Sequence, residues 1–477
     1  MPTFDRRTLL QGGAALALSA TAATEANAAV VVRRSVSAMS LNDPTLVSYR
    51  KAVAAMKALP ANDPRNWTKQ AQIHNNYCPH RNWYFLPWHR AYCVAFERLC
   101  RQLSGDPNFA LPYWDWTANP QLPAAFATPT YNNQPNPLYD ANRSSQTVTI
   151  PAVYVGQAKM NSIYAETSFE IFGSSRPNGQ NSTNPSWQRV GGVEGPFESG
   201  PHDHVHTTIA GDMQTLMSPL YPIFWLHHCN IDRIWDHWNS LGRSNTSDNL
   251  WRTFAFNGQF VDPSGANGTT PYNTAVSGVL NIVALGYRYT LPIFQVFTPL
   301  LLAKFINPGD PIERIKLGPI EAAKINVATV ARAELAPPQT AALNKFSTAF
   351  ARLNITAATA AKPAQAPGRV LLFLRDVDPP MSGNADVRVF INHPGPTAET
   401  STQDRHFAGS FTFFGVDHAD HGGKPSYMLD ITQLVNNLQL AGIDLAKEIN
   451  VQLVPVPIAG VTAASEVKVG SMDVAIF

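Results

Sequence analysis

The pattern of hydrophobic and polar positions changes from helical to strand-like towards the end of the chain. Residues 91–103 and 224–241 carry apolar side chains at helical spacing and predict two amphipathic helices. From Arg369 onward, short runs alternate apolar and polar residues, which is typical of strands. These runs are 369–376, 386–393, 406–414, 450–457 and 466–477. The pattern predicts a mainly α-helical domain with long loops, followed by a small all-β domain of the jelly-roll or sandwich kind.

Length and composition indicate where the domains end. A chain of 477 residues is too long for one ordinary core. Residues 306–367 are rich in Ala, Thr, Pro and Lys and predict a linker, with one helix near 340–353. We therefore expect a helical domain over 29–305 and a β-domain over 368–477.

The first 28 residues resemble an export signal. Arg6 and Arg7 precede a Leu/Ala-rich run, and Ala-Asn-Ala at 26–28 offers a small-residue cleavage site. Paired arginines favour a twin-arginine signal, and a general secretory signal or an uncleaved tail is the alternative. The expected location is the periplasm or the outside of the cell.

Charge narrows the choice of partners. The net charge is +2 and no dense Lys/Arg run occurs, which argues against nucleic acid or an anionic membrane surface. Beyond the export signal, no run is apolar for long enough to span a bilayer. Four cysteines are too few for a disulfide framework. Nothing in the sequence fixes an oligomeric state.

Three histidines lie among aromatic residues in the stretch HNNYCPHRNWYFLPWHR, which begins at His74. His80 and His89 are nine residues apart, which on one straight helix would place them on opposite faces. Pro87 supplies a break, and we expect a helix to begin at about Trp88 with His89 in its first turn. His74 is the remaining upstream histidine, so a third ligand from this half must be His74.

A second set of histidines lies in PHDHVH and LHHCNIDRIWDH. His202 and His206 share one helical face, whereas His204 points elsewhere and is expected to be a bystander. In the second stretch His228 is expected to face the site, and His227 is rotated about 100° away.

The donor types favour a metal pair. Imidazoles without a thiolate quartet or a carboxylate cluster argue against structural zinc, calcium, magnesium or non-haem di-iron. Neutral nitrogen donors suit copper or zinc, and two ions with three nitrogens each would leave facing open positions for a small bridging molecule. Asp232, one turn after His228, is placed to orient an imidazole, and a pair with Arg233 is the alternative.

Four motifs together resemble the type-3 copper proteins, which comprise tyrosinases, catechol oxidases and molluscan haemocyanins. They are His80-x8-His89, LPYWDW, His202-x3-His206 and FWLHHCNIDR. The motif YRY in LGYRYTLP and the segments DVRVFINHP and FAGSFTFF resemble plant-type polyphenol oxidases with their C-terminal domain. The chain thus resembles a bacterial, exported polyphenol oxidase.

The resemblance implies two copper ions and the residues that hold them. The implied ligands are His74, His80 and His89 for copper A, and His202, His206 and His228 for copper B. Cys78 matches a Cys-x-His arrangement that forms a thioether to the histidine ring, here His80, and a free buried thiol is the alternative. Glu198 matches a glutamate that holds a water near the copper pair.

Departures from the family pattern also bear on function. Asp203 stands where many tyrosinases have Asn, and with Glu198 it would polarise a water that removes a phenol's proton. Leu216 or Met217 falls near the position that gates entry over copper A, and Phe224 would pack against the substrate ring. The other cysteines do not match the plant disulfides and are expected to be buried thiols.

The implied activity is the oxidation of o-diphenols to o-quinones with O₂, and ortho-hydroxylation of monophenols stays open. A haemocyanin-like O₂ carrier and an o-aminophenol oxidase are alternatives within the family, and a dinuclear zinc hydrolase is one outside it.

The β-domain would shield the mouth of the active site and keep the intact chain latent, and a stabilising role is the alternative.

Overall fold

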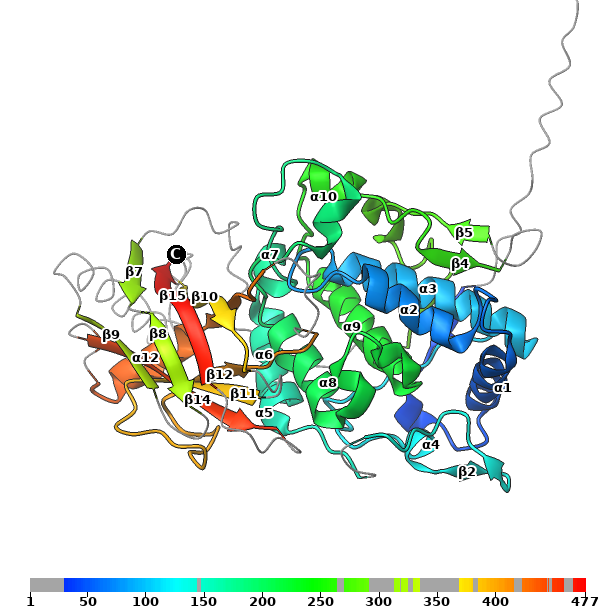
Figure 1. Cartoon of the computed structure of the whole chain (residues 1–477), viewed down its shortest axis with the longest axis horizontal. Helices are drawn as coiled ribbons and strands as arrows, with labels where there is room; N and C mark the ends of the chain where they lie inside the picture. Colours follow the sequence, from blue (N-terminus) through cyan, green and yellow to red (C-terminus); the bar gives the residue numbers. More distant parts are fainter. Residues whose placement is uncertain are drawn as a thin grey trace, which may run out of the picture.

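A computed structural model of the protein describes most of the chain as a helical domain beside a β-domain (Figure 1). The described residues are 30–143, 147–263, 270–290, 313–317, 319–324, 329–334, 369–380, 385–415, 423–443, 445, 448–458 and 466–477. The predicted fold class is confirmed. The predicted export signal and the predicted helix near 340–353 lie outside the described residues.

Five helices build the centre of the helical domain: α1 (Pro44–Ala58), α2 (Trp67–Tyr77), α3 (Phe85–Ser104), α8 (Asp203–Ile209) and α9 (Ile223–Ser240). Shorter helices surround them, namely α4 (Ala124–Ala127), α5 (Ala152–Val155), α6 (Gln157–Ala165), α7 (Phe169–Phe172) and α10 (Asn249–Thr253). The two helices predicted from spacing are confirmed as parts of α3 and α9.

Local sequence sets where these helices begin and end. Asp43 and Asn66 cap α1 and α2 by accepting the N–H groups of Thr45 and Thr68, each at 2.9 Å. Gly105 ends α3 with φ of +72°, a conformation that favours glycine.

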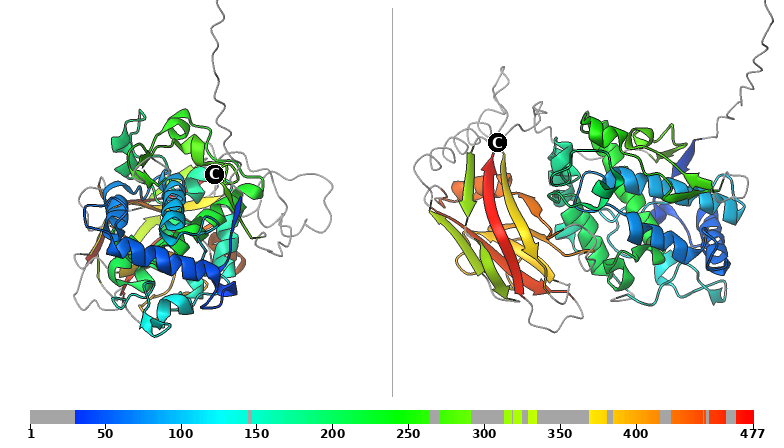
Figure 2. Two further views of the ribbon diagram at one scale, coloured as in Figure 1. Left: turned by 90° about the vertical axis from the view of Figure 1, so that its right-hand side faces the viewer. Right: turned by 45° about the horizontal axis from the view of Figure 1, so that its top comes forward.

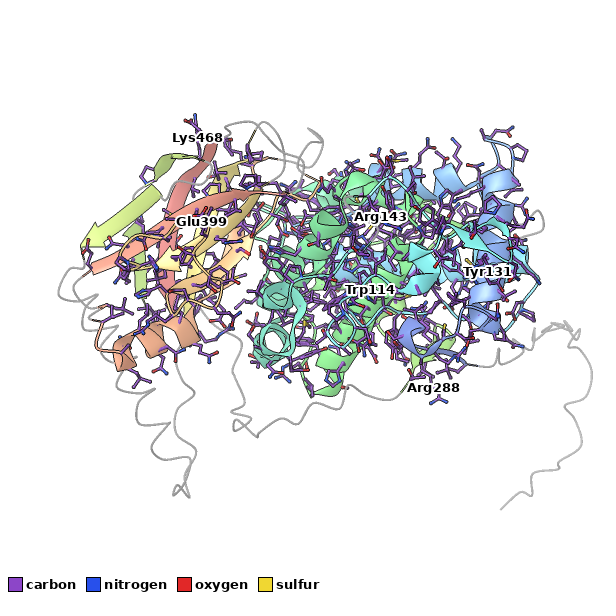
Figure 3. The ribbon with its side chains drawn as sticks, turned by 90° about the horizontal axis from the view of Figure 1, so that it is seen from below. Trp114, Tyr131, Arg143, Arg288, Glu399 and Lys468 are labelled. Carbon is purple, nitrogen blue, oxygen red and sulfur yellow. The ribbon has the colours of Figure 1, made fainter. Side chains whose placement is uncertain are left out.

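α3 and α9 pack against each other through large aromatic rings. The rings of Phe96 and Trp225 stack with centroids 3.4 Å apart, and Tyr92 lies 4.5 Å from Trp225. Trp114 lies deep among the side chains of the same domain (Figure 3). These rings exclude water from the space between the two helices.

The two ends of the helical domain meet in a parallel pair of short strands, β1 (Val31–Arg33) and β6 (Tyr287–Tyr289). Along β6 the side chains alternate, because Tyr287 is fully buried while Arg288 stands at the edge of the domain (Figure 3). Two small hairpins complete this domain: β2 (Thr130–Tyr131) with β3 (Gln134–Pro135), and β4 (Phe260–Asp262) with β5 (Thr270–Tyr272).

A buried ionic network joins this strand pair to α9. The Asp232 carboxylate accepts hydrogen bonds from Arg33 at 3.3 Å, from the Tyr287 hydroxyl at 2.7 Å, and from Arg90 and Tyr289. Although burial opposes ionisation, Arg90 and Arg33 lower the pKa of Asp232. The network ties the ends of the domain to its central helix.

The prediction that Asp232 orients an imidazole is therefore wrong. Both oxygens of its carboxylate are taken by the guanidinium and phenol groups described above, which the linear sequence places far from it. Arg233, its alternative partner, pairs with Asp115 at 3.0 Å instead.

The β-domain is a sandwich of two antiparallel sheets (Figure 2). One sheet has the order β13-β10-β15-β7, with β8 also pairing β15, and the other has the order β12-β11-β14-β9. The strands are β7 (Glu313–Leu317), β8 (Ile320–Lys324), β9 (Thr329–Glu334), β10 (Val370–Asp378), β11 (Ala385–Ile391), β12 (Phe407–Phe411), β13 (Tyr427–Asp430), β14 (Glu448–Pro457) and β15 (Glu466–Ile476). The helix α12 (Thr432–Leu440) packs its apolar side on the core between them.

The predicted linker 306–367 is wrong over its described part. β7 and β8 pair with β15, and β9 pairs with β14, so three strands within the predicted linker belong to the two sheets. Their polar, Ala-rich sequence hides the strand pattern, because edge strands need little apolar surface of their own. The β-domain thus begins some 50 residues earlier than its apolar runs indicate.

The two domains share a closely packed interface. The backbone of Glu194 bonds to Ser426 at 2.8 Å and to Met428 at 3.0 Å, which adds one residue of the helical domain beside β13. Arg369 of the β-domain forms a salt bridge with Glu166 at 2.6 Å. Among the described residues, no helix has the length and apolar character that a bilayer crossing demands.

Replacing Asp232 with Ala should destabilise the helical domain by about 3–5 kcal/mol, because the buried Arg90 guanidinium loses its counter-charge and Arg33 keeps only its salt bridge to Glu97. Urea unfolding followed by tryptophan fluorescence measures the change. The matched control is Arg34→Ala, which removes a half-exposed ion pair to Asp43 and should cost no more than about 1 kcal/mol. Equal losses in the two variants would contradict the structural role of the network.

Candidate metal centre

The first histidine group combines two helices and the turn between them. His74 lies on α2, His89 lies in the first turns of α3, and His80 lies in the non-helical segment that joins them. One nitrogen from each ring falls within 4.8 Å of the others. Segment 78–84 is thus the break that lets His80 and His89 converge, and Pro87 lies inside the first turn of α3 rather than at the break.

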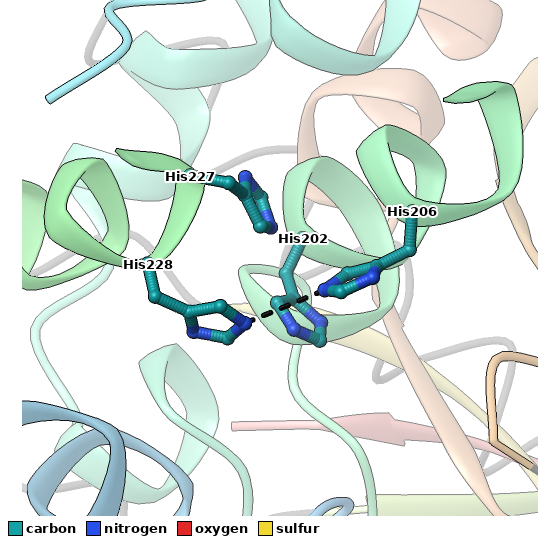
Figure 4. A group of neighbouring side chains, drawn as sticks. All are labelled: His202, His206, His227 and His228. Carbon is teal, nitrogen blue, oxygen red and sulfur yellow. Dashed lines mark hydrogen bonds between the residues drawn. The ribbon is translucent and has the colours of Figure 1, made fainter. Parts of the chain in front are cut away.

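The second group comes from α8 and α9 (Figure 4). His202 ends a π-helical turn (Glu198–His202) that runs into α8, so its ring lies 4.6 Å from that of His206 on the next turn. His228 and His227 of α9 face them, and all four rings offer a nitrogen within 4.8 Å of one another.

The two groups form one centre. The rings of His89 and His228 stack with centroids 4.3 Å apart, and His80 lies 5.6 Å from His202. All of these side chains are buried.

Backbone carbonyls fix the tautomer of several rings. The Nδ1–H groups of His74, His89 and His206 donate to the carbonyls of Leu216, Phe85 and Met213 at 2.7, 2.8 and 2.7 Å. The proton of each neutral ring is therefore on Nδ1, which leaves a lone pair on Nε2. His202 follows the same rule, because its Nδ1 donates to the Asp203 carboxylate at 2.8 Å.

These lone pairs point at one another. Nε2 of His74 lies 3.3 Å from Nε2 of His89, and Nε2 of His206 lies 3.4 Å from Nε2 of His228. Burial lowers the pKa of His74 to about 3 and also lowers the pKa values of His89, His206 and His228, so none of these rings takes up a second proton at neutral pH. Converging neutral imidazole donors in a dry core fit a pair of transition-metal ions such as copper or zinc.

The structure thus brings together all six predicted ligands, and it adds one histidine that was not predicted to lie at the site. His227 was expected to point away from the site, yet it belongs to the second group. The reason is that π-helical turn 198–202 carries His202 to the side of α9 on which His227 lies, where the two rings stack 5.3 Å apart. His204 lies outside the group, as expected.

Three buried carboxyl groups, those of Glu194, Glu198 and Asp203, interact with one another next to His202. Glu198 accepts the backbone N–H of Arg81 at 2.7 Å and the Ser174 hydroxyl at 2.5 Å. Asp203 shares a hydrogen bond with Glu194, a residue that sequence reasoning missed. Burial, followed by their mutual repulsion, raises the pKa values of all three. Asp203 has the imidazole-orienting role that was expected of Asp232.

The predicted gate residues lie over the first group. The Phe224 ring packs between His74 at 5.1 Å and His228 at 4.2 Å. Leu216 is buried and supplies the carbonyl to His74, while Met217 is partly exposed.

The four cysteines are all buried. Burial raises the pKa of the Cys78 thiol, and the thioether between Cys78 and His80 stays a prediction. Cys93, Cys100 and Cys229 are also buried and free.

A ring from the β-domain enters the same centre. Phe414, just after β12, lies 4.0 Å from His206, 5.4 Å from His202 and 5.2 Å from His80. Leu216 packs against the next residue, since a Cβ on Gly415 would lie 3.0 Å from its Cδ2. The sequence places Phe414 in a strand pattern, and nothing in that pattern indicates where its ring goes.

The common central domain of tyrosinase matches residues 53–241, which hold both histidine groups. These residues thus form a tyrosinase-type central domain. Members of this family hold two copper ions, and the six imidazoles of this tyrosinase domain fit such a binuclear site. Residues 324–476 match a domain family of unknown function, DUF7868.

Similar proteins extend the likeness beyond the tyrosinase domain. The tyrosinase HcTyr1 of a Hahella species is 32% identical over 54% of this chain, and the match spans 62% of its length. Polyphenol oxidase A1 of Vicia faba is 29% identical over 90% of the chain and 74% of its own length. Latent aurone synthase shares the fold over 94% of the chain and 90% of its own, with a TM-score of 0.67 at 20% identity. A latent apple tyrosinase covers 94% and 97%, with a TM-score of 0.65 at 22% identity.

Replacing His206 with Gln should lower copper content from two ions per chain to one, because a ring whose Nε2 faces His228 is lost. Atomic absorption after copper loading and gel filtration measures the ratio. His237→Gln is the matched control, since this buried histidine of α9 packs on Tyr164 instead. Two ions retained in the His206 variant would contradict the assignment.

Proposed function

We propose that the protein is a copper-dependent phenol oxidase that oxidises o-diphenols to o-quinones with O₂. The observation that carries the proposal is the facing pair of three-histidine groups whose Nε2 lone pairs converge in a dry core. The relatives named tyrosinase and polyphenol oxidase support the same activity. Buried neutral donors without bridging carboxylate ligands weigh against a zinc hydrolase.

The six predicted ligands would hold two copper ions, which would supply O₂ binding and the transfer of two electrons from the phenol. Around them, the protein positions the substrate and handles its proton. The Phe224 edge would contact the aromatic ring of the substrate. Glu198 and Asp203, with raised pKa values, are suited to accept a phenol's proton through a water.

We also propose that residues 1–28 are an export signal and that the β-domain keeps the intact chain latent. The Phe414 ring lies against the second histidine group, where a phenolic ring would enter. Polar contacts support a fixed position for this ring: Ser410 donates to Nε2 of His204 at 3.1 Å, and the Tyr154 hydroxyl donates to Asp386 at 2.5 Å. Both contacts join the two domains close to α8.

Copper-loaded protein that is cut between the domains should consume O₂ with catechol, and a second assay with tyramine separates the two activities of the family. A protease site placed within residues 291–312, which lie outside the described residues, allows a controlled cut. Uptake with catechol alone makes the protein a catechol oxidase, and uptake with both makes it a tyrosinase. Reversible O₂ binding without turnover would instead support a carrier and defeat the proposal.

Replacing Phe414 with Ala should raise catechol oxidation by the uncut chain at least several-fold, because the ring that covers His206 is removed. The matched control is Phe407→Ala, a ring of the same domain that packs on Phe390 and does not reach the histidines. Unchanged activity in the Phe414 variant, with full activity after cutting, would show that another part of the β-domain closes the site.

A further inference from the structure

The second histidine group contains four rings, although a metal ion with three nitrogen ligands needs only three of them. His227 is the additional ring. It is fully buried, and its centroid lies 4.9 Å from His206, 5.3 Å from His202 and 5.1 Å from His228. In Figure 4 the end of the His227 ring that lies farther from α9 points towards these three side chains.

The tautomer of His227 is the opposite of that of the other rings. Trp116 N–H donates to Nδ1 of His227 at 3.2 Å, and an indole nitrogen can only donate. Nδ1 therefore carries the lone pair, and in the neutral ring the proton is on Nε2. A nitrogen that carries a proton cannot bind a metal ion.

The position of Trp116 is itself fixed by α9. The backbone N–H of Trp114 donates to the Leu226 carbonyl at 3.1 Å, so the LPYWDW segment is bonded to the turn of α9 that carries His227. Trp116 is fully buried beside it. The indole therefore holds one tautomer in place, as the carbonyls do for His74, His89 and His206.

The remaining N–H of His227 has no partner. Its Nε2 atom is buried and no hydrogen bond to it exists within the described residues. A buried donor without an acceptor is costly, which indicates that the acceptor is a ligand of the site. We propose that His227 is not a metal ligand but a hydrogen-bond donor to the anionic atom of a phenolate or small anion bound beside His202, His206 and His228. Trp116 is the positioning residue that sets this role.

The inference rests on the proposed dicopper site, and azide is the probe because it is small and anionic. Wild type, His227→Phe, His227→Gln, Trp116→Phe and the control His237→Phe are loaded with copper as full-length chains. Copper per chain is measured by atomic absorption, and azide affinity is measured by optical titration of the oxidised protein.

We expect two copper ions in every variant. Azide affinity should fall about ten-fold in His227→Phe, which is the size of one hydrogen bond to a charged group. His227→Gln keeps an N–H donor and should stay closer to wild type. Trp116→Phe should weaken azide binding with His227 still present, and His237→Phe should leave it unchanged.

Two results would overturn the inference. Loss of one copper ion in His227→Phe would make His227 a ligand, and unchanged azide affinity in that variant would remove its role as a donor. Fewer than two copper ions in wild type would instead defeat the proposed function itself, so the two failures are distinguishable.

Discussion

Six neutral imidazoles can share a dry core only if each ring has its proton on the side away from the others. The carbonyls of Leu216, Phe85 and Met213 and the carboxylate of Asp203 enforce this arrangement for four of the rings. Two other features of the helical domain keep these rings buried and in place. The aromatic contact between α3 and α9 excludes water, and the Asp232 network holds both chain ends against α9. Copper binding would relieve the repulsion between the facing lone pairs, so the fold and the metal are expected to stabilise each other.

Much of this arrangement could be predicted from the sequence. Apolar spacing located α3 and α9, and helical spacing paired His202 with His206 and turned His228 towards the site, because a helix sets which residues share a face. The ligands of the first group followed from the family resemblance. The direction of Asp232 could not be predicted, since its partners Arg33 and Tyr287 are distant in sequence and reach it only through β1 and β6. His227 was misjudged because the π-helical turn 198–202, which the histidine spacing does not indicate, carries His202 to the side of α9 on which His227 lies.

The β-domain shows the same limit. Its long apolar strands were evident, whereas β7, β8 and β9 were hidden in an Ala- and Lys-rich stretch that pairs at sheet edges. Phe414 follows β12, and strand alternation does not say that a ring will cross to another domain. Glu194 connects the β-domain to the metal site, because its backbone pairs with Tyr427 of the β-domain and its side chain bonds to Asp203. The position of the second domain and the polar surroundings of His202 are therefore coupled through one residue.

The most direct test of the central claim is anomalous diffraction at the copper edge from crystals of the copper-loaded, full-length chain. We expect two peaks, one among His74, His80 and His89 and one among His202, His206 and His228, with the Phe414 ring beside the second. A single peak, or a peak bound by Nε2 of His227, would contradict the account.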